Sequence, residues 1–286
     1  MCSSDLVGLG LIGGSLAGAY KRAGDTVYGI DTDRLTQDFA VMAGSIDGIL
    51  TDDRLKLCEV VFIAITPQRA LRWLTVNSPK IGRETIVIDC CGIKRRICEV
   101  GEKLSDEYGF SFVGGHPMAG KQVGGYKNSR NDLFDGAGFA IVPKDKNDIR
   151  LMTRTKQVLR AAGFAKFAVM TAKEHDEVIA YTSQMAHILS SAYIKGDVID
   201  GRDTFAVSGG AFRDMTRVAY LDEDMWTELF LENRDNLTEE LTEYMTELGR
   251  YLDALKSGDA AALTRLLREE KKRKREVEGE AQALGK

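Results

Sequence analysis

The chain has 286 residues, with 39 basic and 43 acidic side chains and a formal net charge of −4, and this length is enough for one large or two medium domains. The mildly acidic pI near 5.6 argues against a general binder of nucleic acids or anionic membranes, and no apolar run approaches the ~20 residues needed to span a bilayer. Charged residues at 29% and hydrophobic residues at 44% exclude an extensively disordered chain, and the N-terminus lacks the pattern of a secretory signal.

Short apolar, β-rich segments alternate with helix-like segments through the first half of the chain. We predict strands at residues 6–8, 26–31, 60–65, 85–89, 110–113, 139–142 and 164–169, with a helix at 148–162 before the last of them. Residues 1–5 are polar, so the first strand is expected to be short and the start of the chain truncated or replaced. Continuous apolar runs separated by helical lengths are typical of a parallel sheet covered on both faces, which predicts a doubly wound α/β domain over residues 1–170.

After residue 170 the pattern becomes helical only. Thr171 and Glu174 form a capping box that begins the first helix of this part. A longer apolar stripe runs from Trp226 to Leu255 at helical spacing, and so long a helical segment needs a partner to bury it. We therefore predict an all-helical second domain at residues 171–286 that also pairs with a second copy of the chain.

A glycine motif follows the first predicted strand. Gly8, Gly10 and Gly13 fit the pattern G-x-G-x-x-G, with Leu11 and Ile12 between the last two glycines. The first glycine allows a tight turn, the second lets a pyrophosphate approach the backbone, and the third lets the helix pack closely on the strand. A pyrophosphate would then lie over the helix N-terminus, where free N–H groups favour anions. The alternative is a glycine-rich turn without a ligand.

Asp31 closes the second predicted strand and supports the cofactor interpretation. A carboxylate there accepts hydrogen bonds from the adenosine ribose and repels a 2′-phosphate, which favours NAD over NADP, although Arg34 lies nearby. Thr66 and Pro67, directly after the strand at 60–65, complete the expected NAD-binding residues.

His116 lies in the segment GGHPMAG, just after the strand at 110–113. The carboxyl ends of strands in open α/β sheets are where ligands bind. We expect the flanking glycines and Pro117 to form a turn that presents the imidazole. A neutral histidine there can accept a proton from a substrate hydroxyl as hydride leaves; the alternative is a histidine that only hydrogen-bonds a loop.

Arg213 and Arg217 are spaced i, i+4 and would share one helical face. Two arginines so placed can clamp a substrate carboxylate, although a surface pair with nearby acidic residues is equally compatible with the charges. By residue type alone, His187 and Trp226 are expected to be core residues, and His175 a helix-start residue that takes part in capping.

The cysteines and histidines do not predict a metal site. The five cysteines form no CxxC pair, and the three histidines form no HExxH pattern. Because an odd number of cysteines without a secretory signal is typical of free thiols, we expect a reducing, cytoplasmic location and no metal.

The segments that carry these features match one family in chain order, from about residue 6 to residue 267. They are VGLGLIGGSLA, VYGIDTD, DCCGIK, GGHPMAGK, LFDGAGFAIVP, HDEVIAYTSQMAHILSSAYI, GGAFRDMTRVA and DMWTELFLENRDNL. With them the sequence resembles the prephenate dehydrogenase family, the prephenate and arogenate dehydrogenases of tyrosine biosynthesis.

The resemblance implies a Rossmann NAD-binding domain, a helical dimerisation domain and a homodimer. It also implies an oxidoreductase that uses NAD+ to convert prephenate, a small-molecule substrate, to 4-hydroxyphenylpyruvate with loss of CO2. By similarity, His116 is the catalytic histidine that hydrogen-bonds the substrate hydroxyl, and Arg217 binds a substrate carboxylate. His187 lines the substrate pocket, where Gln184, Arg213 and Trp226 are also expected.

Two departures from the family pattern bear on the chemistry. Gly92 stands where many members have a serine that supports the catalytic histidine, so His116 must be oriented by another group or by water. Gln184 replaces the first histidine of a family pair and could shift the preference between prephenate and arogenate. The alternatives are therefore an arogenate dehydrogenase or a non-catalytic NAD-binding regulatory protein. Neither a nucleic-acid nor a membrane partner is expected.

Overall fold

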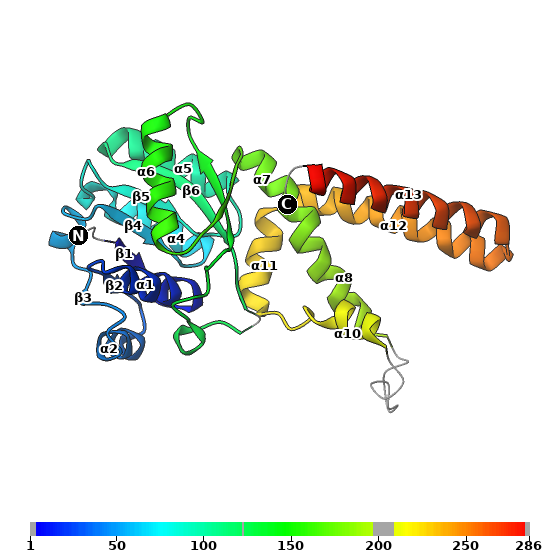
Figure 1. Ribbon diagram of the computed structural model, residues 1–286, viewed down its shortest axis with the longest axis horizontal. Helices are drawn as coiled ribbons and strands as arrows, with labels where there is room; N and C mark the ends of the chain where they lie inside the picture. Colours follow the sequence, from blue (N-terminus) through cyan, green and yellow to red (C-terminus); the bar gives the residue numbers. More distant parts are fainter. Residues whose placement is uncertain (1–3, 122, 197–208, 284–286) are drawn as a thin grey trace. The chain divides into compact units, whose positions relative to one another are not determined.

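The computed structural model describes residues 4–121, 123–196 and 209–283 (Figure 1). The chain divides into two compact units, Met1–Arg234 and Asp235–Lys286. The domain boundary predicted between residues 170 and 171 stays a prediction. In the structure, the strands and the first helices after them belong to one compact unit.

An eight-stranded sheet forms the centre of the first unit, in the order β3-β2-β1-β4-β5-β6-β7-β8. Its strands are β1 (Ser4–Val7), β2 (Tyr28–Ile30), β3 (Gly48–Ile49), β4 (Val60–Ile63), β5 (Ile86–Asp89), β6 (Ser111–Met118), β7 (Gly138–Pro143) and β8 (Lys166–Val169). Neighbouring strands are parallel except β6 and β7, which are antiparallel. The predicted strands are therefore present, but the sheet is mixed, and the short strand β3 was not expected.

The helices of the first unit connect the strands and then continue after β8. They are α1 (Leu11–Ala23), α2 (Arg34–Met42), α3 (Asp52–Leu55), α4 (Pro67–Asn77), α5 (Arg95–Tyr108), α6 (Ile149–Ala161), α7 (Ala172–Ile179), α8 (Ala186–Tyr193), α10 (Gly210–Thr216) and α11 (Glu223–Glu232). Short 3₁₀ turns lie at Ser78–Lys80 and Tyr126–Asn128, and a π-helical stretch at Ala180–Met185 joins α7 to α8.

Two hydrophobic cores lie on opposite faces of the sheet. Successive side chains of a strand point to opposite faces, so Leu6 joins one core while its neighbour Val7 joins the other, and Phe62 and Val61 divide in the same way. Helices α1 and α6 contribute to the first core, and α4 and α5 to the second. The predicted sheet with helices on both faces is confirmed.

The order in which strands are added to the sheet switches sides at β1: β2 and β3 lie on one side of β1, and β4 and the later strands lie on the other. The carboxyl ends of these strands meet there: the Gly8 N–H donates to Ile30 O at 2.8 Å, and the Ala64 N–H donates to Val7 O at 2.8 Å. Such a switch point is where open α/β sheets bind their ligands.

The helices after β8 begin as predicted and then depart from expectation. The capping box of Thr171 and Glu174 is present at the start of α7. The apolar stripe from Trp226 to Leu255 is divided between two helices, however, because the backbone leaves the helical range at Asn233, with φ −116° and ψ 22°. Asn233 is fully buried, and its side-chain amide donates to Asp176 O and to Gln184 Oε1, each at 2.8 Å. These bonds fix the chain where α11 ends.

The second unit contains α12 (Arg234–Ser257) and α13 (Ala260–Ala283). They form a hairpin (Figure 1), with an ion pair between Arg250 and Glu269 at 2.8 Å. An apolar row on α12 remains at least half exposed and consists of Met245, Leu248, Leu252 and Leu255. Among the described residues, no helix is both long enough and apolar enough to cross a bilayer.

Candidate active site

The glycine loop joins β1 to α1 and has a different reason for each glycine. Gly8 has φ +90°, and a Cβ atom there would lie 2.4 Å from Ile65 Cγ2. A Cβ atom on Gly13 would lie 1.8 Å from Gly8 O, whereas one on Gly10 would meet nothing within 4 Å. Gly8 and Gly13 are therefore required by the fold itself, while the space in front of Gly10 fits the approach of a pyrophosphate.

The N-terminus of α1 faces this space without a side-chain cap. Gly10 is the N-cap residue and makes no side-chain cap hydrogen bond, so the first turn at Leu11, Ile12 and Gly13 presents backbone N–H groups. The first turn also contains no acidic side chain. An anion is the ligand that such a helix end favours.

Asp31 directly follows β2, and its side chain hydrogen-bonds the glycine loop. Its Oδ2 accepts from the Leu9 N–H at 2.7 Å, and its Oδ1 accepts from the Asp33 N–H at 2.9 Å. On the other side of the loop, Thr66 is the N-cap and Pro67 the first residue of α4, after β4. The structure thus brings the predicted cofactor residues to the ends of β1, β2 and β4, and they fit a dinucleotide.

His116 lies on β6, where the structure corrects the predicted turn. The segment from Gly114 to Met118 continues the strand, because it pairs with β7 and places His116 opposite Ala140. A Cβ atom on Gly114 would lie 2.5 Å from Cys98 Sγ, and one on Gly115 would lie 2.5 Å from Asp89 O. The two glycines allow close packing under the strand rather than a turn, and the His116 side chain remains partly exposed.

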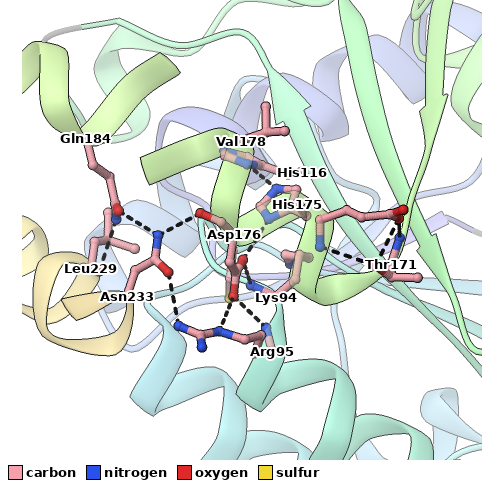
Figure 2. A network of polar contacts seen from close by, with 12 residues as sticks. Lys94, Arg95, His116, Thr171, His175, Asp176, Val178, Gln184, Leu229 and Asn233 are labelled. Carbon is pink, nitrogen blue, oxygen red and sulfur yellow. Dashed lines mark hydrogen bonds and ion pairs between the residues drawn. The ribbon is translucent and has the colours of Figure 1, made fainter. Parts of the chain in front are cut away.

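His116 contacts His175 of α7, which in turn contacts Asp176 (Figure 2). His116 Nδ1 lies 3.0 Å from His175 Nε2, and His175 Nδ1 lies 2.8 Å from Asp176 Oδ1. His175 is 1% exposed and Asp176 is fully buried. Asp176 also accepts from the backbone N–H groups of Lys94 and Arg95, where α5 begins, at 2.7 and 2.9 Å. His116 is therefore held by a buried chain that ends in a carboxylate.

Burial and nearby charge keep both imidazoles neutral. Burial lowers the pKa of His116 well below its ordinary value, and His175 and Lys94 act in the same direction. Burial also lowers the pKa of His175, although Asp176 opposes this shift. Burial disfavours the charge of Lys94, but the adjacent Asp89 carboxylate outweighs this and raises its pKa. The charged Lys94 side chain thus disfavours a proton on either imidazole.

A side chain at residue 92 would lie beside His116 and tightly against α11. A Cβ atom on Gly92 would lie 3.9 Å from His116 Cε1 and 3.3 Å from Cδ2 of Leu229 on α11. Gln184 is 2% exposed, and its amide donates to Leu229 O at 3.0 Å. The structure therefore places Gln184 in a network that holds α11, which favours an indirect influence on the site over direct contact with substrate.

His187 and Trp226 lie against each other. Their ring centroids are 4.0 Å apart, and His187 Nδ1 lies 2.8 Å from Ser183 O. Arg213 lies on α10 and Arg217 directly follows that helix, and both are exposed. Helix α10 packs against α8, which carries His187. These four predicted substrate residues thus lie on or next to α8, α10 and α11, and Gln184 lies in the π-helical stretch before α8.

Comparison with known proteins identifies the group to which this chain belongs. Residues 16–168 match the model of the prephenate dehydrogenase nucleotide-binding domain, and residues 171–269 match the model of the prephenate dehydrogenase dimerization domain. The chain belongs to the prephenate dehydrogenase family.

Individual family members agree over nearly the whole chain. The prephenate dehydrogenase of Bacillus subtilis is 29% identical over 274 residues, which cover 91% of this chain and 72% of that protein. The structure of Synechocystis arogenate dehydrogenase matches with a TM-score of 0.80 and 26% identity, covering 96% of this chain and 99% of the other. The A. aeolicus prephenate dehydrogenase in complex with hydroxyphenyl propionate and NAD+ also matches with a TM-score of 0.80 and 26% identity, covering 97% and 98%.

His175 and Asp176 are the candidate site residues that sequence reasoning missed. The pair begins α7, so a capping role explained it without reference to His116, which is distant in the sequence. Two signals were nonetheless present in the prephenate dehydrogenase pattern. The pair opens the segment HDEVIAYTSQMAHILSSAYI, and Gly92 leaves His116 in need of another partner.

The Gly10→Ala substitution is expected to weaken NAD+ binding about 10- to 100-fold, because the added methyl occupies the space where a pyrophosphate approaches; overpacking of this kind costs about 1–3 kcal/mol. The folded state should keep its stability, because a Cβ atom on Gly10 meets nothing within 4 Å. Calorimetric titration with NAD+ measures the first effect and thermal unfolding the second. The matched Gly13→Ala variant should be destabilised instead. Unchanged NAD+ affinity in Gly10→Ala would remove the glycine loop from the cofactor site.

Proposed function

We propose that this protein catalyses the NAD+-dependent oxidative decarboxylation of prephenate to 4-hydroxyphenylpyruvate, a step of tyrosine biosynthesis. The observation that carries the proposal is the environment of His116. Its neutral imidazole is partly exposed, and its Nδ1 is hydrogen-bonded to the buried pair His175 and Asp176. This histidine lies in a chain that also has a glycine loop and Asp31 suited to NAD.

The reaction requires the protein to remove the proton of the substrate's ring hydroxyl and to return it. Bound NAD+ supplies the hydride acceptor. His116 takes the proton of the ring hydroxyl as hydride leaves the same carbon, and this prevents a positive charge from building up on the oxygen. Loss of the ring carboxylate as CO2 then leaves its bonding electrons in the ring, which becomes aromatic, and His116 returns the proton to the oxygen. Holding the ring in this orientation is the main task of the pocket residues.

The binding residues follow from their positions. We assign Gly8, Gly10, Leu11, Ile12 and Gly13 to the pyrophosphate, since they form the uncapped start of α1. Asp31 is assigned to the adenosine ribose, and Thr66 and Pro67 to the side of the cofactor near β4.

The substrate is bound by residues of the helices after β8. We assign the substrate carboxylates to Arg217 and Arg213, and one wall of the pocket to His187 and Trp226, whose rings lie together. Gln184 acts on this pocket through α11.

The direct test is an assay of the purified protein with prephenate or arogenate and with NAD+ or NADP+, following the absorbance of the reduced nucleotide. We expect rapid reduction of NAD+ with prephenate. No turnover with any of the four combinations, in a protein that binds NAD+, would overturn the proposal and favour a regulatory protein. The intact contact between His116 and His175 argues against that alternative.

Arogenate dehydrogenase is the second candidate. It is favoured by the match to the Synechocystis enzyme of that name, whose TM-score equals that of the A. aeolicus prephenate dehydrogenase in complex with NAD+. The two substrates differ only in a keto-acid or amino-acid side chain. The ratio of kcat/KM for prephenate and arogenate decides between them.

We further propose that the protein is a cytoplasmic homodimer. The match to a dimerization domain supports the dimer, as does the exposed apolar row of Met245, Leu248, Leu252 and Leu255 on α12. Four free cysteines among the described residues are compatible with a reducing compartment.

The Arg217→Ala substitution is expected to raise KM for prephenate about 10- to 100-fold with a much smaller change in kcat. Hydrogen bonds to charged groups are worth about 1.5–3 kcal/mol, and a carboxylate remote from the reacting carbon is bound equally in the ground and transition states. Steady-state kinetics measures both constants. Arg150→Ala, an exposed arginine on α6, is the matched control. An unchanged KM in Arg217→Ala would exclude Arg217 from the substrate site.

A further inference from the structure

His116 lacks the serine partner that many relatives have, yet its ring is not left unsupported. Gly92 offers no hydroxyl. His175 on α7 instead lies 3.0 Å from His116 Nδ1 (Figure 2). We propose that His175 and Asp176 are positioning residues that fix the ring orientation and the tautomer of His116, so that its Nε2 is the proton-accepting atom. This inference rests on the proposed function only for the role of that atom.

The argument starts at Asp176. Its carboxylate accepts three hydrogen bonds whose direction is fixed: Oδ1 from the Lys94 N–H, and Oδ2 from the Arg95 N–H and the Arg95 Nε–H. The backbone and guanidinium groups can only donate, so each oxygen must act as an acceptor. Its ion pair with the Arg95 guanidinium, in which Nε lies 3.3 Å from Oδ2, leaves Asp176 as an acceptor towards His175 Nδ1 as well.

The tautomers of the two histidines follow in sequence. Because Asp176 only accepts, His175 carries its proton on Nδ1, at 2.8 Å from the carboxylate. A neutral His175 then has an unprotonated Nε2, which must accept a hydrogen bond from His116 Nδ1 at 3.0 Å. His116 therefore carries its proton on Nδ1, and its Nε2 keeps a free lone pair.

The surroundings hold this arrangement in place. The Lys94 ammonium, whose pair with Asp89 is completely buried, acts electrostatically on both rings, so a proton added to either ring would be repelled by a second positive charge. The start of α7 is fixed by its capping box, in which the backbone N–H of Thr171 and then its hydroxyl lower the pKa of Glu174 to about 2. Asp176 O further accepts from Asn233 at 2.8 Å, which ties α7 to the end of α11.

A purely structural role for the pair makes a different prediction. If Asp176 served only to cap α5 and His175 only to fill space, the His116 tautomer would not depend on either of them. The tautomer is therefore the property to measure.

Nuclear magnetic resonance of the free protein with ¹⁵N-labelled histidine tests the proposal without substrate. Protonated and unprotonated ring nitrogens have well separated shifts, and the chain contains only three histidines, so the signals can be assigned with His187→Gln and His175→Gln. We expect His116 to be protonated on Nδ1 and unprotonated on Nε2 at neutral pH. Protonation on Nε2 would overturn the proposal. The result does not depend on the reaction, so it remains decisive even if prephenate is not the substrate.

A matched pair of substitutions at His175 tests the consequence for turnover. Glutamine places its amide near the position of Nε2 and keeps an acceptor for His116, whereas asparagine reaches only the position of Nδ1 and loses that contact. We expect His175→Asn to lower kcat about 10- to 100-fold with little change in KM, and His175→Gln to retain most of the activity. Equal losses of kcat in the two variants, with equal thermal stability and an unchanged His116 tautomer, would contradict the positioning role.

Discussion

The His116→Asn variant is expected to turn over prephenate with a kcat lower by about two to four orders of magnitude, the usual size of general acid–base effects. Asparagine reaches the position of Nδ1, so it can keep the hydrogen bond to His175 Nε2, but it has no atom at the position of Nε2. The substitution therefore removes the proposed base while it preserves the buried chain. Steady-state kinetics with saturating NAD+ measures the effect.

Two controls show that the loss of kcat is specific. NAD+ affinity should be unchanged, since the glycine loop and Asp31 follow β1 and β2, which β4 and β5 separate from the strand of His116, and thermal unfolding should shift little. A kcat close to that of the wild type in a folded His116→Asn protein would remove His116 from the chemistry.

The Lys94→Met variant is expected to be less stable by about 3–5 kcal/mol, because it leaves a buried carboxylate without its cation. Lys94 and Asp89 form an ion pair in which both side chains are 0% exposed. Asp89 Oδ1 also accepts from the Cys91 N–H at 2.9 Å, and its Oδ2 accepts from the Gly115 N–H at 3.0 Å, so the carboxylate cannot move to solvent when the ammonium is removed. Urea unfolding of the two proteins measures the difference in free energy.

An exposed ion pair of the same kind provides the comparison. Lys144 lies 2.6 Å from Asp106, with side chains 52% and 65% exposed, and Lys144→Met should cost at most about 1 kcal/mol. If the two methionine variants lost equal stability, burial would not be the cause of the effect at Lys94. The double variant Lys94→Met with Asp89→Asn should recover part of the loss, because the unpaired charge is then removed.

The alternating cores explain why most of the fold could be predicted from the sequence. Buried strands between helices produce continuous apolar runs, and Val60 to Ile63 are buried on both faces as such a run requires. The direction of β7 could not be read in this way, because a buried antiparallel strand has the same apolar pattern as a parallel one. Strand β3 has only two residues and no periodicity to detect.

The site was harder to predict, because its contacts join distant segments. The glycines around His116 suggested a turn, but their small size serves the packing of β6 against Asp89 and Cys98. Likewise, the helical stripe that begins at Trp226 gave no sign of a break at Asn233, whose buried amide bonds are tertiary. What the sequence did indicate at Gly92 was a missing group, and only the packing of α7 showed that His175 lies at His116.

The hydrogen bonds of His175 and Asp176 limit where the substrate's hydroxyl proton can go in the proposed reaction. After His116 takes the proton, the next basic atom is His175 Nε2, but burial and the Lys94 ammonium lower the pKa of His175. The carboxylate beyond it already accepts from Lys94, His175 and twice from Arg95. The hydrogen-bonded series from His116 to Asp176 therefore orients His116 and does not carry the proton away. In the proposed mechanism the proton stays on His116 and returns to the oxygen it left. The protein then has the same protonation state before and after turnover.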